Sequence, residues 1–253
     1  MTLTSWSAFS RDPLWSPIKS GFDSPTPPIN PMQLRLRELF AETPLYAILD
    51  TSALRGALTS PMTGRSSLEA LEALLQAGVR VVQYRHKEAF RRTHLEECQE
   101  MARRARERGC LLLVNDRADV ADLCGAGGVH LGQDDLPVEM ARQLLGPDRC
   151  IGYSTHSLDQ ALAAQASSAD YIAIGPVFAT STKIAPDPVV GLETVALVRS
   201  AVNKPLVAIG GITLENAAAV LNAGASAVAV VRDLLTAPDL EARARQLLAA
   251  LKI

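Results

Sequence analysis

Two aspartates follow short apolar runs at corresponding places in the sequence. Asp116 comes directly after one run, and Asp135 follows the next run along the chain. If the two runs are neighbouring strands, their ends meet at one edge of a sheet, where both carboxylates can bind one hard cation such as Mg²⁺. Arg85 and Lys87 lie at the end of an earlier run and add positive charge. A cation beside an arginine fork and a lysine suits a pyrophosphate group.

The spacing of the residues around Arg85 supports a shared site. Alternation along a strand places the side chains of Gln83, Arg85 and Lys87 on one face. A strand end that simply faces solvent does not require this pattern. For Asp116 the competing interpretation is a carboxylate that caps a helix starting at residue 118. The residues alone leave both interpretations of Asp116 open.

Apolar runs alternate with helical patterns from residue 45 onward. Eight strand–helix units in about 210 residues predict a single (β/α)₈ TIM barrel. The competing fold, an open doubly wound sheet, usually carries Gly-x-Gly-x-x-Gly after its first strand, and this motif is missing after residue 50. The predicted strands are 45–50, 79–85, 111–115, 127–131, 150–154, 171–177, 205–210 and 227–231, and the predicted helices are 68–77, 93–108, 118–124, 137–145, 158–166, 192–201, 214–223 and 240–251.

The polar residues of interest all follow predicted strands, which is where TIM barrels carry their chemistry. Random placement would divide them between the two rims of the barrel, so their shared rim is stronger evidence than any single motif. They are Gln83, Arg85 and Lys87 after the second strand, Asn115 and Asp116 after the third, Gln133 and Asp135 after the fourth, Ser154 after the fifth, Thr180, Thr182 and Lys183 after the sixth, Gly210 and Gly211 after the seventh, and Val231 and Arg232 after the eighth.

The beginning of the chain differs from the barrel. Residues 1–31 are rich in proline and show no periodic pattern, so we expect a flexible extension, and Met32 is a candidate start of the protein. Residues 32–43 are expected to form a short helix that covers one end of the barrel, and residues 44–253 the catalytic barrel itself. The extension lacks the charged and apolar regions of a secretory signal.

Composition limits the partners and the compartment. The formal net charge of −2 gives no basic footprint, so small acidic molecules are more plausible partners than nucleic acid. No apolar run approaches the roughly 20 residues needed to cross a bilayer. The four cysteines lack paired spacing and suit reduced packing residues in a cytoplasmic protein. A homo-oligomer is compatible with the sequence.

In this order, the motifs resemble those of the thiamine phosphate synthase family, from about residue 45 to the C-terminus. A lone motif of this kind is only moderately specific, whereas the ordered set is highly specific. The matching motifs are Gln83-x-Arg85-x-Lys87, Asn115-Asp116-Arg117, Gly128-Val129-His130-Leu131-Gly132-Gln133-x-Asp135, Ser154-Thr155-His156, Gly175-Pro176-Val177-Phe178-x-Thr180-x-Thr182-Lys183, Pro188-x-x-Gly191 and Ala208-Ile209-Gly210-Gly211-Ile212.

The resemblance implies a transferase that joins 4-amino-2-methyl-5-pyrimidinylmethyl diphosphate to a thiazole ethyl phosphate, often carboxylated, and releases pyrophosphate. It implies that two aspartates hold Mg²⁺ and that a set of charged and polar side chains binds the diphosphate. It also implies that the glycines after the seventh strand, with the turn after the eighth, cradle the thiazole phosphate. The roles implied are Asp116 and Asp135 as metal ligands, Arg85, Lys87, Ser154 and Lys183 as catalytic groups at the diphosphate, Thr180 and Thr182 at the thiazole, Asn115 and Gln133 at the pyrimidine or behind the metal ligands, Gln83 at the substrate, and Gly210, Gly211, Val231 and Arg232 at the phosphate.

Other positions carry weaker expectations. Arg232 departs from the family, which commonly has a small hydroxyl residue there, so it either strengthens phosphate binding or points to solvent. His130 is expected to be a hydrogen-bonded barrel residue and His156 a helix cap, while His86 and His94 are expected at the surface. Two rival functions are a thiazole tautomerase-like paralogue and a non-catalytic phosphate-binding barrel. The complete set of diphosphate and metal residues disfavours both.

Overall fold

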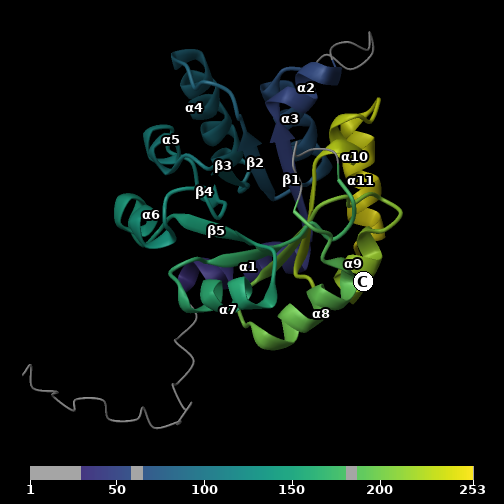
Figure 1. Ribbon diagram of the computed structural model, residues 1–253. Coiled ribbons are helices and arrows are strands. Elements are labelled where there is room, and N and C mark those ends of the chain that lie inside the picture. The colour runs from purple at the N-terminus through teal and green to yellow at the C-terminus, as the bar shows by residue number, and fades with distance from the viewer. Residues whose placement is uncertain (1–29, 58–64, 181–186, 253) are drawn as a thin grey trace, which may run out of the picture.

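A closed barrel of eight parallel strands forms the centre of the protein, and its helices lie outside the strands (Figure 1). The computed structural model describes residues 30–57, 65–180 and 187–252. Each strand pairs with the next along the chain, and β1 pairs with β8 to close the barrel. The predicted (β/α)₈ fold is therefore confirmed. The strands are β1 Leu45–Asp50, β2 Val81–Arg85, β3 Leu111–Asn115, β4 Gly128–Leu131, β5 Cys150–Thr155, β6 Tyr171–Ile174, β7 Leu206–Ile209 and β8 Ala227–Val230.

All eight predicted crossover helices are present, with ends that differ by a few residues. The largest difference is at α9, predicted to start at residue 214. There Asn216 accepts a hydrogen bond from the backbone N–H of Thr213, and the resulting turn delays the helix to Ala217. These helices are α3 Ser67–Ala77, α4 Arg92–Glu107, α5 Ala118–Leu123, α6 Val138–Leu145, α7 Leu158–Ala166, α8 Gly191–Ala201, α9 Ala217–Asn222 and α11 Leu240–Ala250.

Two short helices were not predicted from the sequence. Helix α2, Thr51–Ala57, begins directly after β1, where the side chain of Asp50 accepts from the backbone N–H groups of Ser52 and Ala53. Helix α10, Arg232–Leu235, follows β8 and has only four residues. Neither is long enough to show a helical period in the sequence. No helix in the described ranges is long and apolar enough to span a membrane.

One short helix closes the interior of the barrel at the end opposite the site. Helix α1, Pro31–Glu42, buries Met32, Leu36 and Phe40 against the inward-facing side chains of the strands. The side chain of Asn30 caps this helix by accepting from the N–H of Gln33 at 2.7 Å. The helix therefore starts one residue before its predicted position. The extension was expected to be flexible, but its residues 1–29 lie outside the described ranges.

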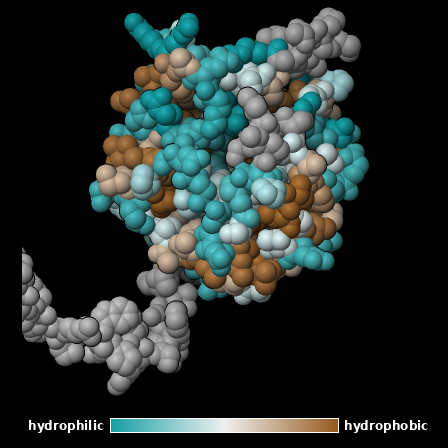
Figure 2. All heavy atoms as spheres, in the orientation of Figure 1, coloured by the Kyte–Doolittle hydropathy of each residue, from teal (hydrophilic) through white to brown (hydrophobic). Residues whose placement is uncertain are grey.

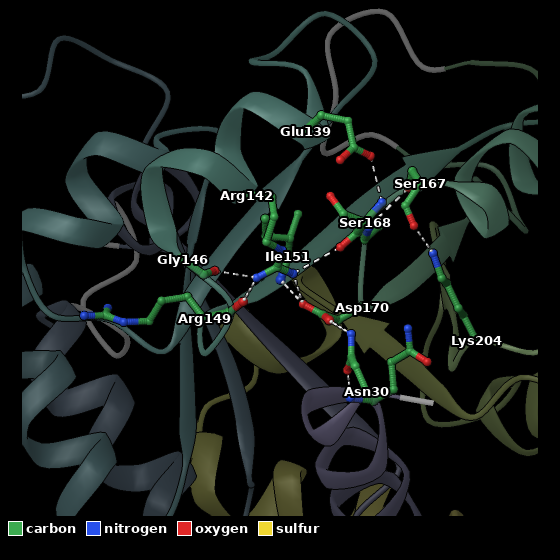
Figure 3. A network of polar contacts seen from close by, with 12 residues as sticks. Asn30, Glu139, Arg142, Gly146, Arg149, Ile151, Ser167, Ser168, Asp170 and Lys204 are labelled. Carbon is green, nitrogen blue, oxygen red and sulfur yellow. Dashed lines mark hydrogen bonds and ion pairs between the residues drawn. The ribbon is translucent and has the colours of Figure 1, made fainter. Parts of the chain in front are cut away.

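A polar network attaches the start of α1 to the loops before β5 and β6 (Figure 3). Its centre is the fully buried carboxylate of Asp170, which accepts from Asn30 Nδ2 at 2.8 Å and from Arg142 Nη2 at 2.6 Å. The backbone N–H of Ile151 donates to the same carboxylate at 2.8 Å. One side chain thus joins the start of α1 to α6 and β5, which lie far from α1 in the sequence.

The contacts of Asn30 give a prediction for shortened chains. A chain that starts at Asn30 should keep its full activity and melting temperature, because it retains the cap of α1 and the bond to Asp170. A chain that starts at Met32 lacks both contacts and should lose at least about 1 kcal/mol of stability, the size of the missing cap alone, which corresponds to roughly 2–4 °C or more in melting temperature. Thermal unfolding and turnover of both chains test this. A tenfold lower kcat/KM for the Asn30 chain would assign the extension a role in the site.

Candidate active site

The polar residues predicted to share one rim do lie at the carboxyl ends of the strands. Figure 2 shows hydrophilic side chains running from the top of the visible face through its centre, with apolar side chains at the left and over the lower part. Arg85 is the last residue of β2, Asn115 is the last residue of β3, and Ser154 is the last residue but one of β5. Parallel strands bring these positions to the same mouth.

The two aspartates lie together in this mouth. Asp116 has a φ of 64°, a left-handed conformation uncommon for a residue with a side chain. Its backbone N–H donates to the carbonyl of His130 on β4 at 2.8 Å, which holds the turn after β3. Asp135 accepts from the N–H of Gly132 at 2.7 Å. Burial raises the pKa of Asp135; the Gly132 N–H acts against this, and the adjoining Asp116 carboxyl, within hydrogen-bonding reach, raises the pKa further.

The helix-cap interpretation of Asp116 is wrong. The N-terminal capping position of α5 is Arg117, and no side chain caps this helix. Instead, Asp116 accepts from Lys87 Nζ at 2.5 Å. The left-handed turn therefore points the carboxylate towards a neighbouring strand rather than along its own helix. The prediction that Lys87 and the two aspartates meet at one place is confirmed by these contacts, whereas their roles stay predictions.

Arg85 has a buried partner that the sequence analysis missed. Its guanidinium forms an ion pair with Asp50, whose side chain is 2% exposed, while the arginine side chain is 20% exposed. Burial opposes ionisation of Asp50, but hydrogen bonds from Ser52 and Ala53, together with Arg85, hold its pKa below the usual range. Asp50 and Arg85 are direct partners in the pairing of β1 with β2. Asp50 therefore fixes the position of the guanidinium in the mouth.

Gln83 and Asn115 lie deeper than the charged residues. Gln83 is 2% exposed and donates from Nε2 to the hydroxyl of Tyr46 at 2.7 Å, inside the barrel. Asn115 is 7% exposed, and its Nδ2 has no hydrogen-bond partner among the described residues. A buried donor without a partner costs roughly 1–3 kcal/mol. The amide of Asn115 is thus a donor that a bound ligand can satisfy.

Ser154 and Gln133 contact each other at the end of β5. Gln133 is exposed and donates from Nε2 to the backbone carbonyl of Ser154 at 2.5 Å. The hydroxyl of Ser154 lies 2.8 Å from His130 Nε2, and His130 Nδ1 lies 2.7 Å from the hydroxyl of Tyr171. His130 is thus a hydrogen-bonded barrel residue, as predicted. Burial lowers its pKa to about 4, with Asp135 acting against that shift, so the ring is neutral near pH 7.

The low pKa of His130 predicts how stability depends on pH. Between pH 6.5 and 4 the unfolded chain binds a proton that the folded protein does not. The free energy of unfolding should therefore fall as the pH falls through this range, by about 3 kcal/mol from this group. Urea unfolding of the wild type and His130→Gln at several pH values measures the contribution. The free energy of unfolding should depend less steeply on pH in the variant than in the wild type. Equal slopes would contradict the contribution assigned to His130.

Gly210 and Gly211 have a packing role besides the expected approach of a phosphate, which stays a prediction. Both have positive φ, 102° and 64°, and a Cβ on either would collide with the loop after β6, at Pro176 and at Ala179 respectively. The N–H of Phe178 donates to the carbonyl of Gly210 at 3.0 Å. The two glycines therefore allow the loops after β6 and β7 to pack closely.

For the other predicted site residues the structure gives only their position in the fold and their exposure, or no description. Val231 is half-buried and directly precedes α10, and Arg232 is the exposed first residue of that helix. Thr180 is half-buried at the end of a described range, and Thr182 and Lys183 lie outside the described residues. The roles of these residues stay predictions.

Two expectations for histidines are wrong. His86 is buried at 6% exposure, and its Nδ1 lies 2.9 Å from the hydroxyl of Thr51. Its ring packs beside that of His94, which is half-buried, so the pair belongs to a small aromatic cluster outside the barrel. His156 does not cap α7, because Ser157 does so through its side chain. Instead, His156 Nδ1 contacts the carbonyl of Gly175 at 2.5 Å.

Paired carboxylates, a lysine and an arginine gather at the carboxyl ends of the strands, which is where enzymes with a (β/α)₈ barrel carry their active sites. A family profile described as thiamine monophosphate synthase matches residues 45–234. The thiamine-phosphate synthase of Koribacter versatilis is 46% identical over 195 residues, which cover 77% of this chain and 90% of that protein. The one from Chloroflexus aurantiacus is 44% identical over 209 residues, covering 83% and 93%.

A solved structure agrees with the sequence relatives. The thiamine phosphate pyrophosphorylase of Pyrococcus furiosus superposes with a TM-score of 0.73 at 33% identity, over 84% of this chain and 97% of that one. The chain therefore belongs to the thiamine-phosphate synthase family. The resemblance stated from the motifs is confirmed.

Proposed function

We propose that this protein is a thiamine-phosphate synthase, a transferase that joins 4-amino-2-methyl-5-pyrimidinylmethyl diphosphate to a thiazole ethyl phosphate. The products are thiamine phosphate and pyrophosphate, with carbon dioxide as well when the thiazole is carboxylated. Family membership supports the reaction. The observation that carries the proposal is the contact of Lys87 with Asp116 beside Asp135, because a cationic side chain and a pair of carboxylates able to bind a metal ion would serve a diphosphate together.

The charges in the mouth suit cleavage of a diphosphate ester. The bond between the methylene carbon and the diphosphate oxygen breaks with its electron pair on oxygen. The thiazole nitrogen then donates its lone pair to the methylene carbon. Negative charge grows on the leaving group in the transition state, so cations already in place stabilise it more than the substrate. Arg85, held by Asp50, and Lys87 are placed for this role.

The donor set fits Mg²⁺. Two adjoining carboxylates, one of them with a raised pKa in the absence of a cation, are relieved of mutual repulsion when a cation binds. Mg²⁺ is usually held by one or two carboxylates, with water and substrate phosphate oxygens as its other ligands, and Asp116 and Asp135 match that pattern. When bound, Mg²⁺ would neutralise charge on the diphosphate.

The polar residues deeper in the mouth suit the pyrimidine. The unpaired Nδ2 of Asn115 can donate to a ring nitrogen, which also removes the cost of leaving it unsatisfied. We propose that Ser154 contacts the diphosphate. Thr180, Thr182 and Lys183 are proposed at the thiazole side and the leaving group, and the turn from Val231 to Arg232 with the Gly210–Gly211 loop at the thiazole phosphate.

The proposal also covers the cellular compartment and the oligomeric state of the protein. We propose a cytoplasmic protein, because all four cysteines are free and buried. A homo-oligomer remains part of the proposal, and light scattering would test it. The barrel, residues 44–253, is the catalytic unit in this scheme, with residues 1–31 as an extension.

The activity is tested by mixing the purified protein with both substrates and measuring pyrophosphate. We expect release that requires both substrates and is abolished by a chelator of divalent cations and restored by Mg²⁺. Conversion of a thiazole isomer without pyrophosphate would indicate a tautomerase, and binding of either substrate without any product would indicate a non-catalytic barrel. Either result would overturn the proposal.

A further inference from the structure

A chain of hydrogen bonds crosses the interior of the barrel and ends at the mouth. It begins at Gln83 Nε2, which donates to Tyr46 Oη at 2.7 Å, and continues from Tyr46 Oη to Tyr171 Oη over 3.0 Å. Tyr171 Oη lies 2.7 Å from His130 Nδ1, and His130 Nε2 lies 2.8 Å from Ser154 Oγ. The first four residues are at most 7% exposed, while Ser154 is half-buried. Five strands thus contribute to one continuous path.

The number of protons in the chain decides the direction of every bond. Gln83 donates to Tyr46, so the hydroxyl of Tyr46 still has its own proton to place. Within the described part of the protein, the only other hydrogen-bond partner of that hydroxyl is Tyr171 Oη. If Tyr46 donates to Tyr171, then Tyr171 must donate to His130 Nδ1. A neutral imidazole has one N–H, and it is then on Nε2.

The opposite direction leaves a buried proton without an acceptor. If His130 Nδ1 donated to Tyr171, then Tyr171 would donate to Tyr46, and Tyr46 would already accept from Gln83. The proton of Tyr46, which is 1% exposed, would have no partner. An unsatisfied buried donor costs roughly 1–3 kcal/mol, which favours the first arrangement by about fivefold to about a hundredfold. The same count of protons excludes the imidazolium, because a proton on Nδ1 would again leave one of the two buried tyrosine hydroxyls without an acceptor.

The arrangement determines what Ser154 offers to a ligand. Its hydroxyl oxygen accepts from His130 Nε2, so its single proton must point elsewhere, and the mouth is the open side of this half-buried residue. Diphosphate oxygens accept hydrogen bonds and cannot donate them when ionised. A serine held as a donor therefore matches a diphosphate, whereas a serine that donated to His130 would present a lone pair and repel it.

We propose that Tyr46, Tyr171 and His130 are positioning residues that fix His130 as its Nε2–H tautomer and thereby hold Ser154 as a hydrogen-bond donor to the departing diphosphate. The proposal rests on the proposed function for the identity of the ligand, although the tautomer itself does not depend on it. In this scheme the three residues act through Ser154.

The tautomer is tested directly by ¹⁵N NMR of the full chain labelled at histidine. The chain has four histidines, and the spectrum of His130→Gln identifies the signals of His130. We expect a neutral ring with the proton on Nε2 at pH 7, with or without substrates. A ring protonated on Nδ1, or on both nitrogens, would overturn the proposal whether or not the protein is a thiamine-phosphate synthase.

Kinetics test whether the tautomer matters for Ser154. Tyr171→Phe removes the hydroxyl that donates to His130 and should lower kcat by about tenfold, the size of one hydrogen bond, without changing the KM for the thiazole phosphate. In a Ser154→Ala background the same substitution should change kcat less than about twofold, since the residue that it acts through is absent. A polar core with a purely structural role would give the same loss in both backgrounds, which would overturn the proposal.

Tyr84→Phe is the matched control. Tyr84 is also a fully buried tyrosine whose hydroxyl donates a hydrogen bond, to Glu97 at 2.7 Å, but it lies outside the chain of bonds. The Tyr84→Phe variant should lose about as much stability as Tyr171→Phe and keep the kcat of the wild type. If kcat falls equally in both variants, the loss reflects general damage to the barrel and the proposed positioning role is wrong. If the wild type itself releases no pyrophosphate, the proposed function fails while the tautomer result stands.

Discussion

Asp135→Asn should fold normally and need far more Mg²⁺ than the wild type for half-maximal turnover. The substitution keeps an oxygen that can accept from the Gly132 N–H and removes one of the two charges that we propose to hold the cation. It also removes the repulsion from Asp116 that contributes to the raised pKa of Asp135. Thermal stability without Mg²⁺ should therefore be unchanged or slightly higher. The measurement is turnover against Mg²⁺ concentration.

The double variant and a neighbouring residue make this test specific. Adding Asp116→Asn should cause little further loss, because the two carboxylates act as one unit. Asp134→Asn is the control, since Asp134 is exposed, adjacent in sequence and not predicted to be a ligand. Its Mg²⁺ dependence should equal that of the wild type. An unchanged Mg²⁺ dependence in Asp135→Asn would remove the metal assignment and much of the support for diphosphate chemistry.

Arg85→Ala should lower kcat by about 10²–10³, the usual cost of losing one group that stabilises a transition state electrostatically. The binding of thiazole phosphate should change little, because the guanidinium faces the other substrate in our scheme. The variant also leaves the buried carboxylate of Asp50 with the N–H groups of Ser52 and Ala53 but no cation. Some loss of stability is therefore expected, and steady-state kinetics must be read with a melting curve.

Two further variants separate the role of Arg85 in binding from its role in folding. Arg85→Lys keeps a positive charge near Asp50 but loses the fork, so stability should largely return while kcat stays low. Arg55→Ala is the control, because Arg55 forms an exposed ion pair with Glu88 near the same rim. It should leave turnover unchanged. A normal kcat in Arg85→Ala, with only a weaker affinity for the thiazole phosphate, would show that Arg85 binds the thiazole phosphate and not the diphosphate.

Much of the fold was predictable because each strand carries its own local signal. A parallel strand covered on both faces is apolar throughout, and all eight such runs became strands. The aspartates were predictable as a pair, since Asp116 and Asp135 follow neighbouring strands of a parallel sheet. Helices α2 and α10 were missed, because a helix of one or two turns shows no period and depends on caps such as Asp50.

Contacts that depend on the register or on the barrel interior could not be predicted. The pairing of Asp50 with Arg85 follows from the alignment of β1 with β2, which no local pattern specifies. The same holds for Gln83, whose strand face was predicted correctly but whose partner, Tyr46, lies on another strand. His86 looked like a surface residue because a histidine among charged neighbours gives no sign of the aromatic cluster that buries it.

The carboxylate of Asp170 has a consequence for the order in which the chain folds. It joins Asn30, at the start of α1, to Arg142 and to the backbone of Ile151. During synthesis Asn30 leaves the ribosome 140 residues ahead of its partner, so this contact has a very high sequence separation. Loop closure over such a distance is slow and unfavourable until the intervening strands have assembled. We therefore expect α1 to dock last. Its apolar side chains can be buried only after the strands have closed the barrel.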